Sequence, residues 1–370
     1  MKSHTLHFKS PGRINLIGEH TDYNSGYVLP AAIDRCLTFH LQKAEDPTHA
    51  TFHSHNMQAQ FQVNLESVKP GEGWENYLLG VLHQLQLRGK TIHGFTCSIT
   101  SDLPLGSGLS SSAALECGLA WGLNELFQME LSPWEIIELS QAAEHTYVGT
   151  QCGIMDQFAC VMGKAGHFIL LDCQSLKHRY IPADLGDYRL LLLNTGVTHD
   201  LASSAYNQRR EACQTGVGLL SAAFPGVKSL RDATPEMLES QKKNMSKRIY
   251  NRCKYVIEEN LRVLQAVEAL EAGKMELLGQ LLLDTHRGLR DEYEVSCAEL
   301  DFLVDEAAKF AGVAGARMVG GGFGGCTLNL VKTEAAEAFQ THIMGQYQKV
   351  FGVVPEPIAV GIGPGVGQLI

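Results

Sequence analysis

The sequence lacks any long hydrophobic run and any excess of basic residues. No segment approaches the roughly 20 apolar residues that span a bilayer, and the opening MKSHTLHFKSPGR has no apolar stretch long enough for a signal peptide. Thirty Lys and Arg stand against 40 Asp and Glu, a formal net charge of −10, so no general basic face is available for a nucleic acid. These absences predict a cytoplasmic protein with neither a membrane nor a nucleic-acid partner.

Paired cysteines and several standard catalytic motifs are also missing. The ten cysteines are scattered through 370 residues without a CxxC pair, which favours reduced, buried thiols over a disulfide framework. Neither HExxH nor GxSxG occurs, so the sequence does not indicate a zinc protease or a serine hydrolase. The Walker-type loop GxxxxGK[ST] is absent as well, so a phosphate would have to be held by another kind of loop.

Length and residue periodicity predict two domains of the α+β (mixed α/β) class. A chain of 370 residues, 45% of them apolar, exceeds what one hydrophobic core usually organises. Alternation predicts a strand or hairpin over residues 51–63 and strands over 93–100, 166–171 and 188–193. Helical spacing predicts helices over 74–87, 113–127 and from Ser132 onward, the last with Ile136, Leu139 or Ser140, Ala143 and Tyr147 on one face.

The second half is expected to be mostly helical beyond residue 201, with strands returning late. Two apolar stripes predict helices, one through Ile257, Leu261, Leu264 and Val267 and the other through Leu300, Leu303, Ala307 and Phe310. The late strands are expected over 326–331 and 358–362. We therefore predict an N-terminal domain over residues 1–182 and an α+β C-terminal domain over residues 183–370.

The most specific string is PGRINLIGEHTDY, residues 11–23. Glu19, His20 and Asp22 place three polar groups within four residues, a spacing that could read a fixed pattern of hydroxyls on a polyol or sugar. The alternative is an ordinary polar turn with a capping Asp22 and a solvated Glu19.

A second string, PLGSGLSSSAA at residues 104–114, combines glycines and serines immediately before a predicted helix. Glycines let backbone N–H groups approach a phosphate, the helix N-terminus adds partial positive charge, and hydroxyls add donors or a Mg²⁺ ligand. Ordinary capping of the helix is the alternative. The candidate phosphate-binding residues are Gly106, Ser107, Gly108, Leu109, Ser110, Ser111 and Ser112.

A late glycine cluster, GGGFGG at residues 320–325, formally satisfies the dinucleotide-binding pattern GxGxxG. Its context disfavours that function, because the glycines lead into the strand-like CTLNLV instead of opening a helix. No acidic residue stands about twenty positions on, where a ribose-binding carboxylate belongs. A glycine turn required only for tight packing is the remaining alternative.

Single carboxylates and histidines complete the candidates. In CGIMDQF, residues 152–158, Asp156 stands among apolar neighbours and could accept a hydroxyl proton if a cation such as Arg13 kept it ionised; a helix N-cap is the alternative. Glu144 is similarly isolated and could face solvent or a cation. Three histidines lie close together in the sequence and suggest metal binding: His49, His53 and His55. Because they match no known zinc-ligand pattern, an exposed strand is the favoured interpretation.

Taken together and in order, the four strings resemble the motifs of galactokinases within the GHMP small-molecule kinase superfamily. The first string resembles a galactokinase signature, and the glycine-serine loop is shared by the superfamily. The resemblance implies a two-lobed fold with a mixed N-terminal domain, a ferredoxin-like C-terminal domain and the active site between them. It also implies ATP-dependent phosphorylation of the C1 hydroxyl of α-D-galactose with Mg²⁺, giving galactose 1-phosphate and ADP.

The resemblance further implies a role for each site residue. Asp156 would accept the sugar proton, and Arg13 would stabilise that carboxylate and the transferring phosphoryl group. The residues implied to hold the sugar are Glu19, His20, Asp22, Gly153 and Tyr206. The loop from Gly106 to Ser112 would cradle the ATP phosphates, Ser112 and Glu144 would hold Mg²⁺, and the late glycines would line the same cleft.

Two rival functions stay open on the sequence alone. One is a kinase of another sugar, such as an N-acetylated galactose or arabinose. The other is a galactose sensor that binds sugar and ATP without turnover; such relatives have lost part of the serine loop, whereas GLSSSAA is intact here. The expected oligomeric state is a monomer, with galactose and ATP as the small-molecule partners.

Overall fold

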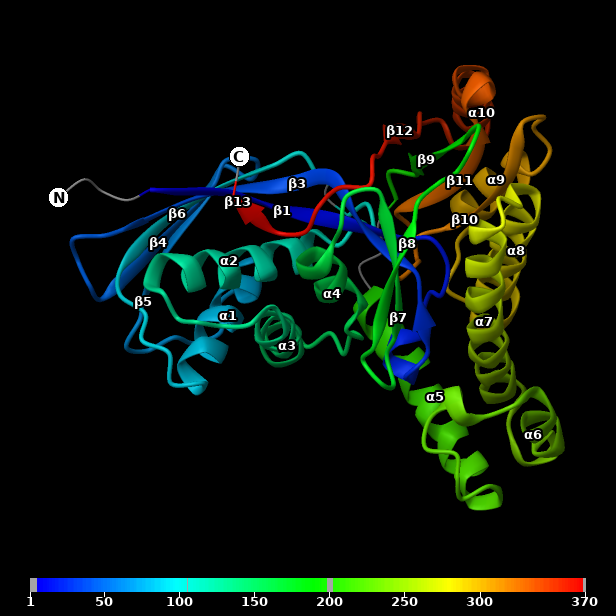
Figure 1. Ribbon diagram of the computed structural model, residues 1–370, viewed down its shortest axis with the longest axis horizontal. Helices are drawn as coiled ribbons and strands as arrows, with labels where there is room; N and C mark the ends of the chain where they lie inside the picture. Colours follow the sequence, from blue (N-terminus) through cyan, green and yellow to red (C-terminus); the bar gives the residue numbers. More distant parts are fainter. Residues whose placement is uncertain (1–4, 105, 198–201, 369–370) are drawn as a thin grey trace.

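Two lobes lie side by side along the long axis of the molecule (Figure 1). The computed structural model describes residues 5–104, 106–197 and 202–368, so Leu105 of the glycine-serine string lies outside the described residues. The blue and cyan first part of the chain builds one lobe, and the yellow and orange part builds the other.

A six-stranded sheet forms the first lobe, in the order β13-β1-β3-β6-β4-β5. Its strands are β1 (Leu6–Asn15), β3 (Pro30–Lys43), β4 (His49–Ser54), β5 (Ala59–Asn64), β6 (Phe95–Ser101) and β13 (Gly367–Gln368). Neighbours are antiparallel except for the parallel pair β4 and β6. β1 alternates buried and exposed residues at first and is wholly buried from Ser10 to Asn15, which carries Arg13 into the interior.

Helices cover one face of this sheet (Figure 1). They are α1 (Glu75–Leu87), α2 (Ser111–Phe127), α3 (Pro133–Ala143) and α4 (Met155–Met162). α2 packs closely because it presents glycine to the sheet: a Cβ on Gly118 would lie 2.4 Å from Phe39, and one on Gly122 would lie 2.5 Å from Phe8. The close packing fixes the N-terminus of α2 beside the buried end of β1.

A three-stranded sheet, β2-β7-β8, lies beside the first lobe's helices. Its strands are β2 (Tyr27–Val28), β7 (His167–Asp172) and β8 (His178–Pro182). β2 follows the turn that contains Glu19, His20 and Asp22, and its antiparallel pairing with β7 fixes where that turn ends.

The second lobe contains an antiparallel sheet in the order β10-β11-β9-β12. Its strands are β9 (Tyr188–Asn194), β10 (Val313–Met318), β11 (Cys326–Lys332) and β12 (Glu356–Ala359). Numbered along the chain, the strands lie in the order 2-3-1-4, which is the ferredoxin-like arrangement. The helices are α5 (Ala202–Ala223), α6 (Pro235–Ser240), α7 (Lys247–Glu271), α8 (Met275–Gly288), α9 (Ala298–Ala307) and α10 (Ala336–Phe351).

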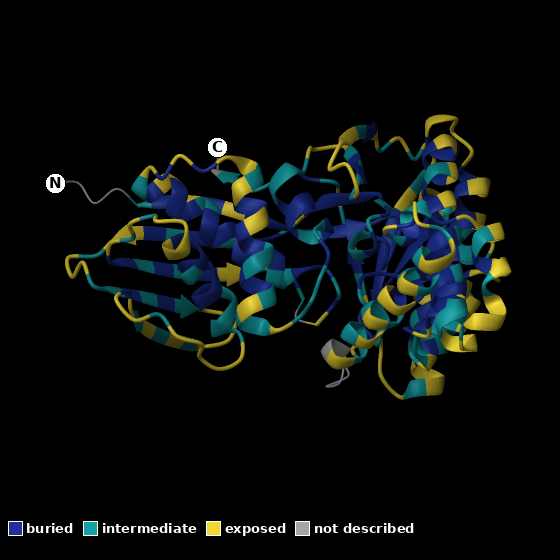
Figure 2. Cartoon of the chain, turned by 90° about the horizontal axis from the view of Figure 1, so that it is seen from below, coloured by how far each residue is buried: buried dark blue, intermediate teal, exposed yellow. Residues whose placement is uncertain are grey.

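Buried residues lie in the interior of both lobes (Figure 2). One apolar cluster extends from Phe8 and Phe39 in the first lobe to Val263 on α7 and Leu328 on β11 in the second. The lobes therefore share a packed interface, so a polar site placed between them is held by a continuous core.

Most elements predicted from periodicity are confirmed. These are the hairpin over β4 and β5, strands β6, β7, β9 and β11, helices α1 and α2, and the Ser132 cap of α3, which forms a full capping box with Glu135. Of the predicted face of α3, Ile136 and Ala143 are buried, and Tyr147 lies half-buried in the following turn η2 (Glu144–Val148).

Some element predictions were wrong. On α7 two residues of the predicted stripe, Ile257 and Val267, are buried, but Leu261 is 50% exposed. The buried face of that helix also includes Val256, Asn260 and Val263. The last predicted strand, 358–362, is β12 at Glu356–Ala359. The stripe through Leu300 holds, except that Phe310 lies beyond α9 and is half-buried.

The division of the chain at residue 182 stays a prediction. β13 pairs with β1, and Ile362 forms a bridge with Ile33, so the chain end returns to the first lobe (Figure 1).

Candidate active site

Arg13 and Asp156 form a bidentate ion pair between β1 and the first turn of α4. Arg13 Nε lies 2.7 Å from Asp156 Oδ1, and Nη2 lies 2.7 Å from Oδ2. Burial alone would lower the pKa of Arg13, but the adjacent Asp156 carboxylate outweighs it and raises the pKa. The arginine is therefore a fixed cation that holds the carboxylate in one orientation.

The same pair reaches the glycine-serine loop. Arg13 Nη1 donates to the carbonyl oxygen of Gly108 at 2.7 Å, and Ser110 Oγ donates to Asp156 Oδ2. Ser110 has a left-handed backbone (φ 60°) and directly precedes α2. Three of the strings singled out in the sequence thus meet at one carboxylate.

Asp22 packs directly against Gly153. A Cβ on Gly153 would lie 1.9 Å from Asp22 Oδ2, so no side chain fits at that position without moving the carboxylate. The Met155 N–H also faces Oδ2, at 3.4 Å. Burial, followed by the nearby charge of Asp156, raises the pKa of Asp22 to about 6.

Glu19 is buried, 1% exposed, with both carboxylate oxygens engaged. Oε1 accepts from the Gly320 N–H at 3.1 Å, and Oε2 lies 2.6 Å from Asn15 Nδ2 and 2.9 Å from Arg317 Nη2. The alternative of a solvated Glu19 was therefore wrong. The residue ties the first string to the late glycine turn and so joins the two lobes.

His20 presents one ring nitrogen to the protein and leaves the other unpaired. Its backbone is left-handed (φ 62°), and Nδ1 lies 2.7 Å from the Tyr23 hydroxyl. Nε2 is buried and makes no hydrogen bond of standard geometry among the described residues, although the Gly321 backbone lies close enough to the ring to act weakly on its pKa. Burial lowers the pKa of His20 to about 3, so the imidazole is neutral at physiological pH. Its ring lies 5.4 Å from that of Tyr206.

These side chains surround one cavity of about 130 Å³. It brings together every predicted sugar-side residue, from β1, the turn after β1, α4, α5 and the late glycine turn. The lining residues are Arg13, Glu19, His20, Asp22, Glu144, Thr150, Cys152, Gly153, Met155, Asp156, Tyr206, Gly320 and Gly321.

A second cavity, of about 210 Å³, opens at the N-terminus of α2. Ser111 and Ser112 line it together with the aromatic residues Trp74 and Tyr77. The other polar residues of its lining are Ser54, Asn56 and Ser101. The composition suits a flat, apolar ring system whose polar extension points at a helix N-terminus.

Two glycine turns pack backbone to backbone beside these cavities. A Cβ on Gly320 would lie 2.9 Å from the Gly108 carbonyl oxygen, and one on Gly325 would lie 3.0 Å from that of Ser107. Gly108 and Gly320 also have left-handed backbones, with φ of 76° and 80°. The late glycine cluster thus packs tightly, as the tight-packing alternative predicted, and the segment that it packs against is the glycine-serine loop.

Glu144 lies buried between the two cavities. The prediction that it could face solvent was therefore wrong. Its Oε2 accepts from Gln157 Nε2 at 3.1 Å. Burial, followed by the charge of Asp156, raises the pKa of Glu144 to about 7. Its charge also helps to raise the pKa of Tyr77 in the second cavity, after burial.

Sequence reasoning missed two buried charged residues near this site, Glu116 and Arg317. Glu116 on α2 receives a long hydrogen bond from Gln157, and burial followed by the charge of Glu144 raises its pKa well above the usual value. A lone acid within the apolar run ALECGLA was the available signal. Arg317 donates from Nε to the Leu16 carbonyl oxygen at 2.8 Å, but nothing in its local sequence marks it.

Helix α7 holds the backbone of the sugar-side turn from the opposite lobe. Glu259 accepts from the Gly18 N–H at 2.9 Å, Asn260 accepts from the Tyr27 N–H at 2.8 Å, and the Tyr255 hydroxyl donates to the Glu19 carbonyl at 3.0 Å. The turn is thereby fixed at its start, middle and end.

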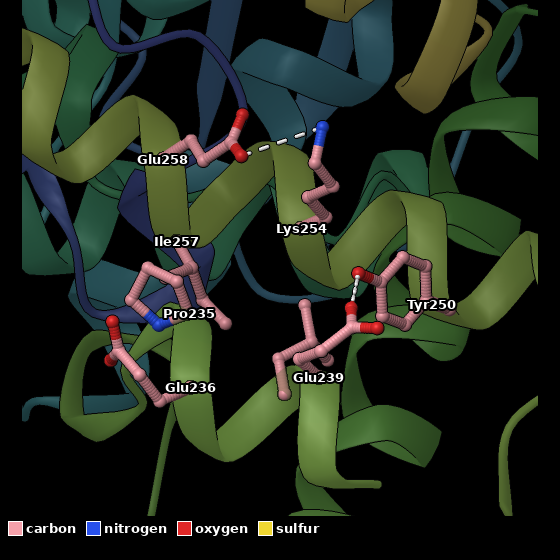
Figure 3. Close-up of a pocket in the computed structure, with 8 residues that line it drawn as sticks. Pro235, Glu236, Glu239, Tyr250, Lys254, Ile257 and Glu258 are labelled. Atoms are coloured by element: carbon pink, nitrogen blue, oxygen red, sulfur yellow. Dashed lines mark hydrogen bonds and ion pairs between the residues drawn. The ribbon is translucent and has the colours of Figure 1, made fainter. Parts of the chain in front are cut away.

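Two other places in the structure have fewer features of a functional site. His49 Nδ1 pairs with Asp46, and within the described ranges no three His, Cys, Asp or Glu side chains group so as to hold a metal ion. A cavity of about 280 Å³ between α6 and α7 contains none of the predicted site residues. Four of its polar side chains form two pairs, Lys254 with Glu258 at 3.4 Å and Tyr250 with Glu239 (Figure 3). Across the part of the chain with described coordinates, no helix has the length and apolarity to cross a membrane.

Comparison with known proteins places this geometry in a family. Models of the GHMP kinase N-terminal and C-terminal domains match residues 76–164 and 266–347, and a galactokinase galactose-binding signature matches residues 2–43. The galactokinase of Thermotoga maritima is 42% identical over 93% of this chain and 95% of its own length. That of a Roseiflexus species is 38% identical over 98% of this chain and 92% of its own.

Solved structures of related proteins support the same family assignment. The crystal structure of Lactococcus lactis galactokinase complexed with galactose matches with a TM-score of 0.95 at 36% identity, over 99% of this chain and 95% of that one. A Methanococcus jannaschii mevalonate kinase shares the fold, with a TM-score of 0.69 at 18% identity over 98% of this chain and all of the other. The chain belongs to the galactokinase family of GHMP kinases.

Proposed function

We propose that the cavity between Asp22 and Asp156 holds galactose and that the cavity at Ser112 holds ATP. As a galactokinase, the chain transfers the γ-phosphoryl group of ATP to the C1 hydroxyl of galactose, giving galactose 1-phosphate and ADP. The observation that carries the proposal is the Arg13–Asp156 pair, which faces the first cavity and is bonded to the loop that leads to the second.

On the sugar side, the carboxylates are the acceptors for hydroxyl protons. Asp22 and Asp156 line the same cavity, and the pair with Arg13 keeps Asp156 fixed as the group that receives or orients the C1 proton. His20 supplies a ring nitrogen to the sugar, and Tyr206 supplies a ring surface beside it. Glu19 supports the turn that holds His20 and Asp22, and Gly153 leaves room for the Asp22 carboxylate.

On the nucleotide side, the wall of Trp74 and Tyr77 suits the base, and the α2 N-terminus suits the phosphates. The loop from Gly106 to Ser112 leads into that terminus with serine hydroxyls and backbone donors. Phosphoryl transfer asks mainly for positioning and for stabilisation of charge, which these donors and Arg13 supply. An acidic chain can therefore bind ATP without a general basic surface.

Mg²⁺ fits the remaining groups. Glu144 is a buried carboxylate beside Asp156 with a pKa of about 7, so a cation there would relieve the cost of its charge. Mg²⁺ is usually held by one or two carboxylates together with substrate phosphates and water, so no ready-made protein cage is required. Glu144 and the Ser112 hydroxyl would hold it, and it would neutralise charge on the phosphates.

All proposed site residues come from one chain, so the proposal requires no second copy. The ten cysteines are free, which supports a cytoplasmic location, because thiols stay reduced there.

The direct test is ADP release measured over a panel of sugars, with wild type, Asp156→Asn and the control Asp187→Asn. Asp187 is exposed on the second lobe. We expect turnover with galactose and not with glucose, and a loss of about 100-fold or more in kcat for Asp156→Asn alone.

Two results would contradict this assignment. Galactose binding without ADP release would identify a sensor. A kcat for Asp156→Asn within about tenfold of wild type would remove Asp156 from the proton-accepting role.

A further inference from the structure

A chain of buried hydrogen bonds leads from His20 into the second lobe. His20 Nδ1 lies 2.7 Å from the Tyr23 hydroxyl, which lies 2.8 Å from the Tyr293 hydroxyl. Tyr293 OH lies 3.3 Å from Cys213 Sγ on α5. Tyr293 and Cys213 are fully buried, so the chain is shielded from water at its far end.

Each group of this chain carries a proton. Burial raises the pKa of both Tyr23 and Tyr293 well above the usual value, and raises that of Cys213 to about 11. Two phenols and one thiol therefore provide three protons for three hydrogen bonds. His20 is neutral and has a single ring proton, on either Nδ1 or Nε2.

The chemistry of the two ends favours one direction of donation. If Cys213 donates to Tyr293, Tyr293 to Tyr23 and Tyr23 to Nδ1, all three protons are used and an sp² imidazole nitrogen accepts the last bond. The reverse direction would make the weakly accepting sulfur the final acceptor and leave the thiol proton at the end of the chain. Donation toward His20 therefore satisfies more of the buried polar groups.

We propose that the Cys213–Tyr293–Tyr23 chain fixes His20 in the tautomer protonated on Nε2, so that this nitrogen donates a hydrogen bond to a galactose hydroxyl. The buried Nε2, which makes no hydrogen bond of standard geometry and has only the Gly321 backbone acting weakly on its ring, and the position of His20 in the cavity wall carry the proposal. Tyr293 is then a positioning residue: it lies outside the cavity and acts on the sugar only through the tautomer of His20. This inference rests on the proposed placement of galactose in that cavity.

The test compares Tyr293→Phe with Tyr347→Phe. Tyr347 is an equally buried tyrosine, whose hydroxyl donates to the Thr195 carbonyl at 3.0 Å in the second lobe. Losing one neutral hydrogen bond corresponds to a change of about three- to tenfold in binding. We expect Tyr293→Phe to raise KM for galactose by that factor with kcat and KM for ATP retained, and Tyr347→Phe to leave all three unchanged.

Nitrogen NMR of histidine-labelled protein reads the tautomer itself. The His20 resonances are assigned by comparison with His20→Gln, and the two ring nitrogens have different shifts in the two tautomers. We expect Nε2–H in wild type and a mixture in Tyr293→Phe. Nδ1–H in wild type, or an unchanged tautomer in a variant with raised KM, would overturn the proposal.

A series of deoxygalactoses then identifies the accepting hydroxyl. The penalty of Tyr293→Phe should disappear for the one deoxysugar that lacks it, because the interaction is already absent. A penalty of equal size with every deoxysugar would overturn the role of Nε2 as donor. If galactose leaves the His20 resonances unmoved in wild type while turnover continues, the sugar placement fails instead, and the tautomer measured without sugar still decides the direction of the chain.

Discussion

The contact between Gly153 and Asp22 gives the sharpest prediction about sugar binding. In Gly153→Ala the new Cβ would lie 1.9 Å from Asp22 Oδ2 and 2.1 Å from Cγ, far inside van der Waals contact, so the carboxylate must move. A hydrogen bond to a charged group contributes about 1.5–3 kcal/mol. We therefore expect kcat/KM for galactose to fall about 10- to 100-fold, with KM for ATP unchanged.

Two further variants make this prediction specific. Gly218→Ala is the matched control, because Gly218 lies exposed on α5 with nothing within 4 Å of its Cβ position, and it should leave activity unchanged. Asp22→Ala should lose as much as Gly153→Ala, and the double variant should lose no more than either, since both remove the same contact. Additive losses, or a Gly153→Ala enzyme within twofold of wild type, would refute the reasoning.

Two remaining predictions concern pH and stability. The pKa of Asp22 rises from 3.8 to about 6 on folding, so the native state binds more protons in that interval and stability falls as pH increases from about 4 to about 6. Thermal unfolding should show this slope in wild type and less of it in Asp22→Asn; equal slopes would contradict the assignment. Arg317→Met should destabilise the protein by about 3–5 kcal/mol in chemical denaturation, because it leaves Glu19 buried without its ion-pair partner, and adding Glu19→Gln should recover part of the loss. A denaturation midpoint at the wild-type value would show that this ion pair is dispensable.

Local features were predicted well where one local rule dominated. The capping box at Ser132, the alternating hairpin over β4 and β5 and the serine-led start of α2 each depend on neighbours only a few residues away. Leu261 was wrongly placed on the buried face of α7, although Ile257 and Val267 of the same stripe are buried, because spacing reveals that a helix has an apolar face but not which neighbour covers it. Helix α7 turns its polar Glu259 and Asn260 inward, toward the sugar-side turn, where they find partners.

The sequence by itself determined the chemistry of each string. The glycines, the serine hydroxyls and the clustered Glu19, His20 and Asp22 are properties of adjacent residues, and their resemblance to galactokinases follows from those residues alone. Only the tertiary structure decided which groups meet. Arg13 and Asp156 are 143 positions apart, and Tyr23 and Tyr293 are 270 positions apart. The first pair forms because α4 packs on β1 within the first lobe, and the second because the two lobes pack on one another through a shared core. No local spacing encodes where a distant segment returns.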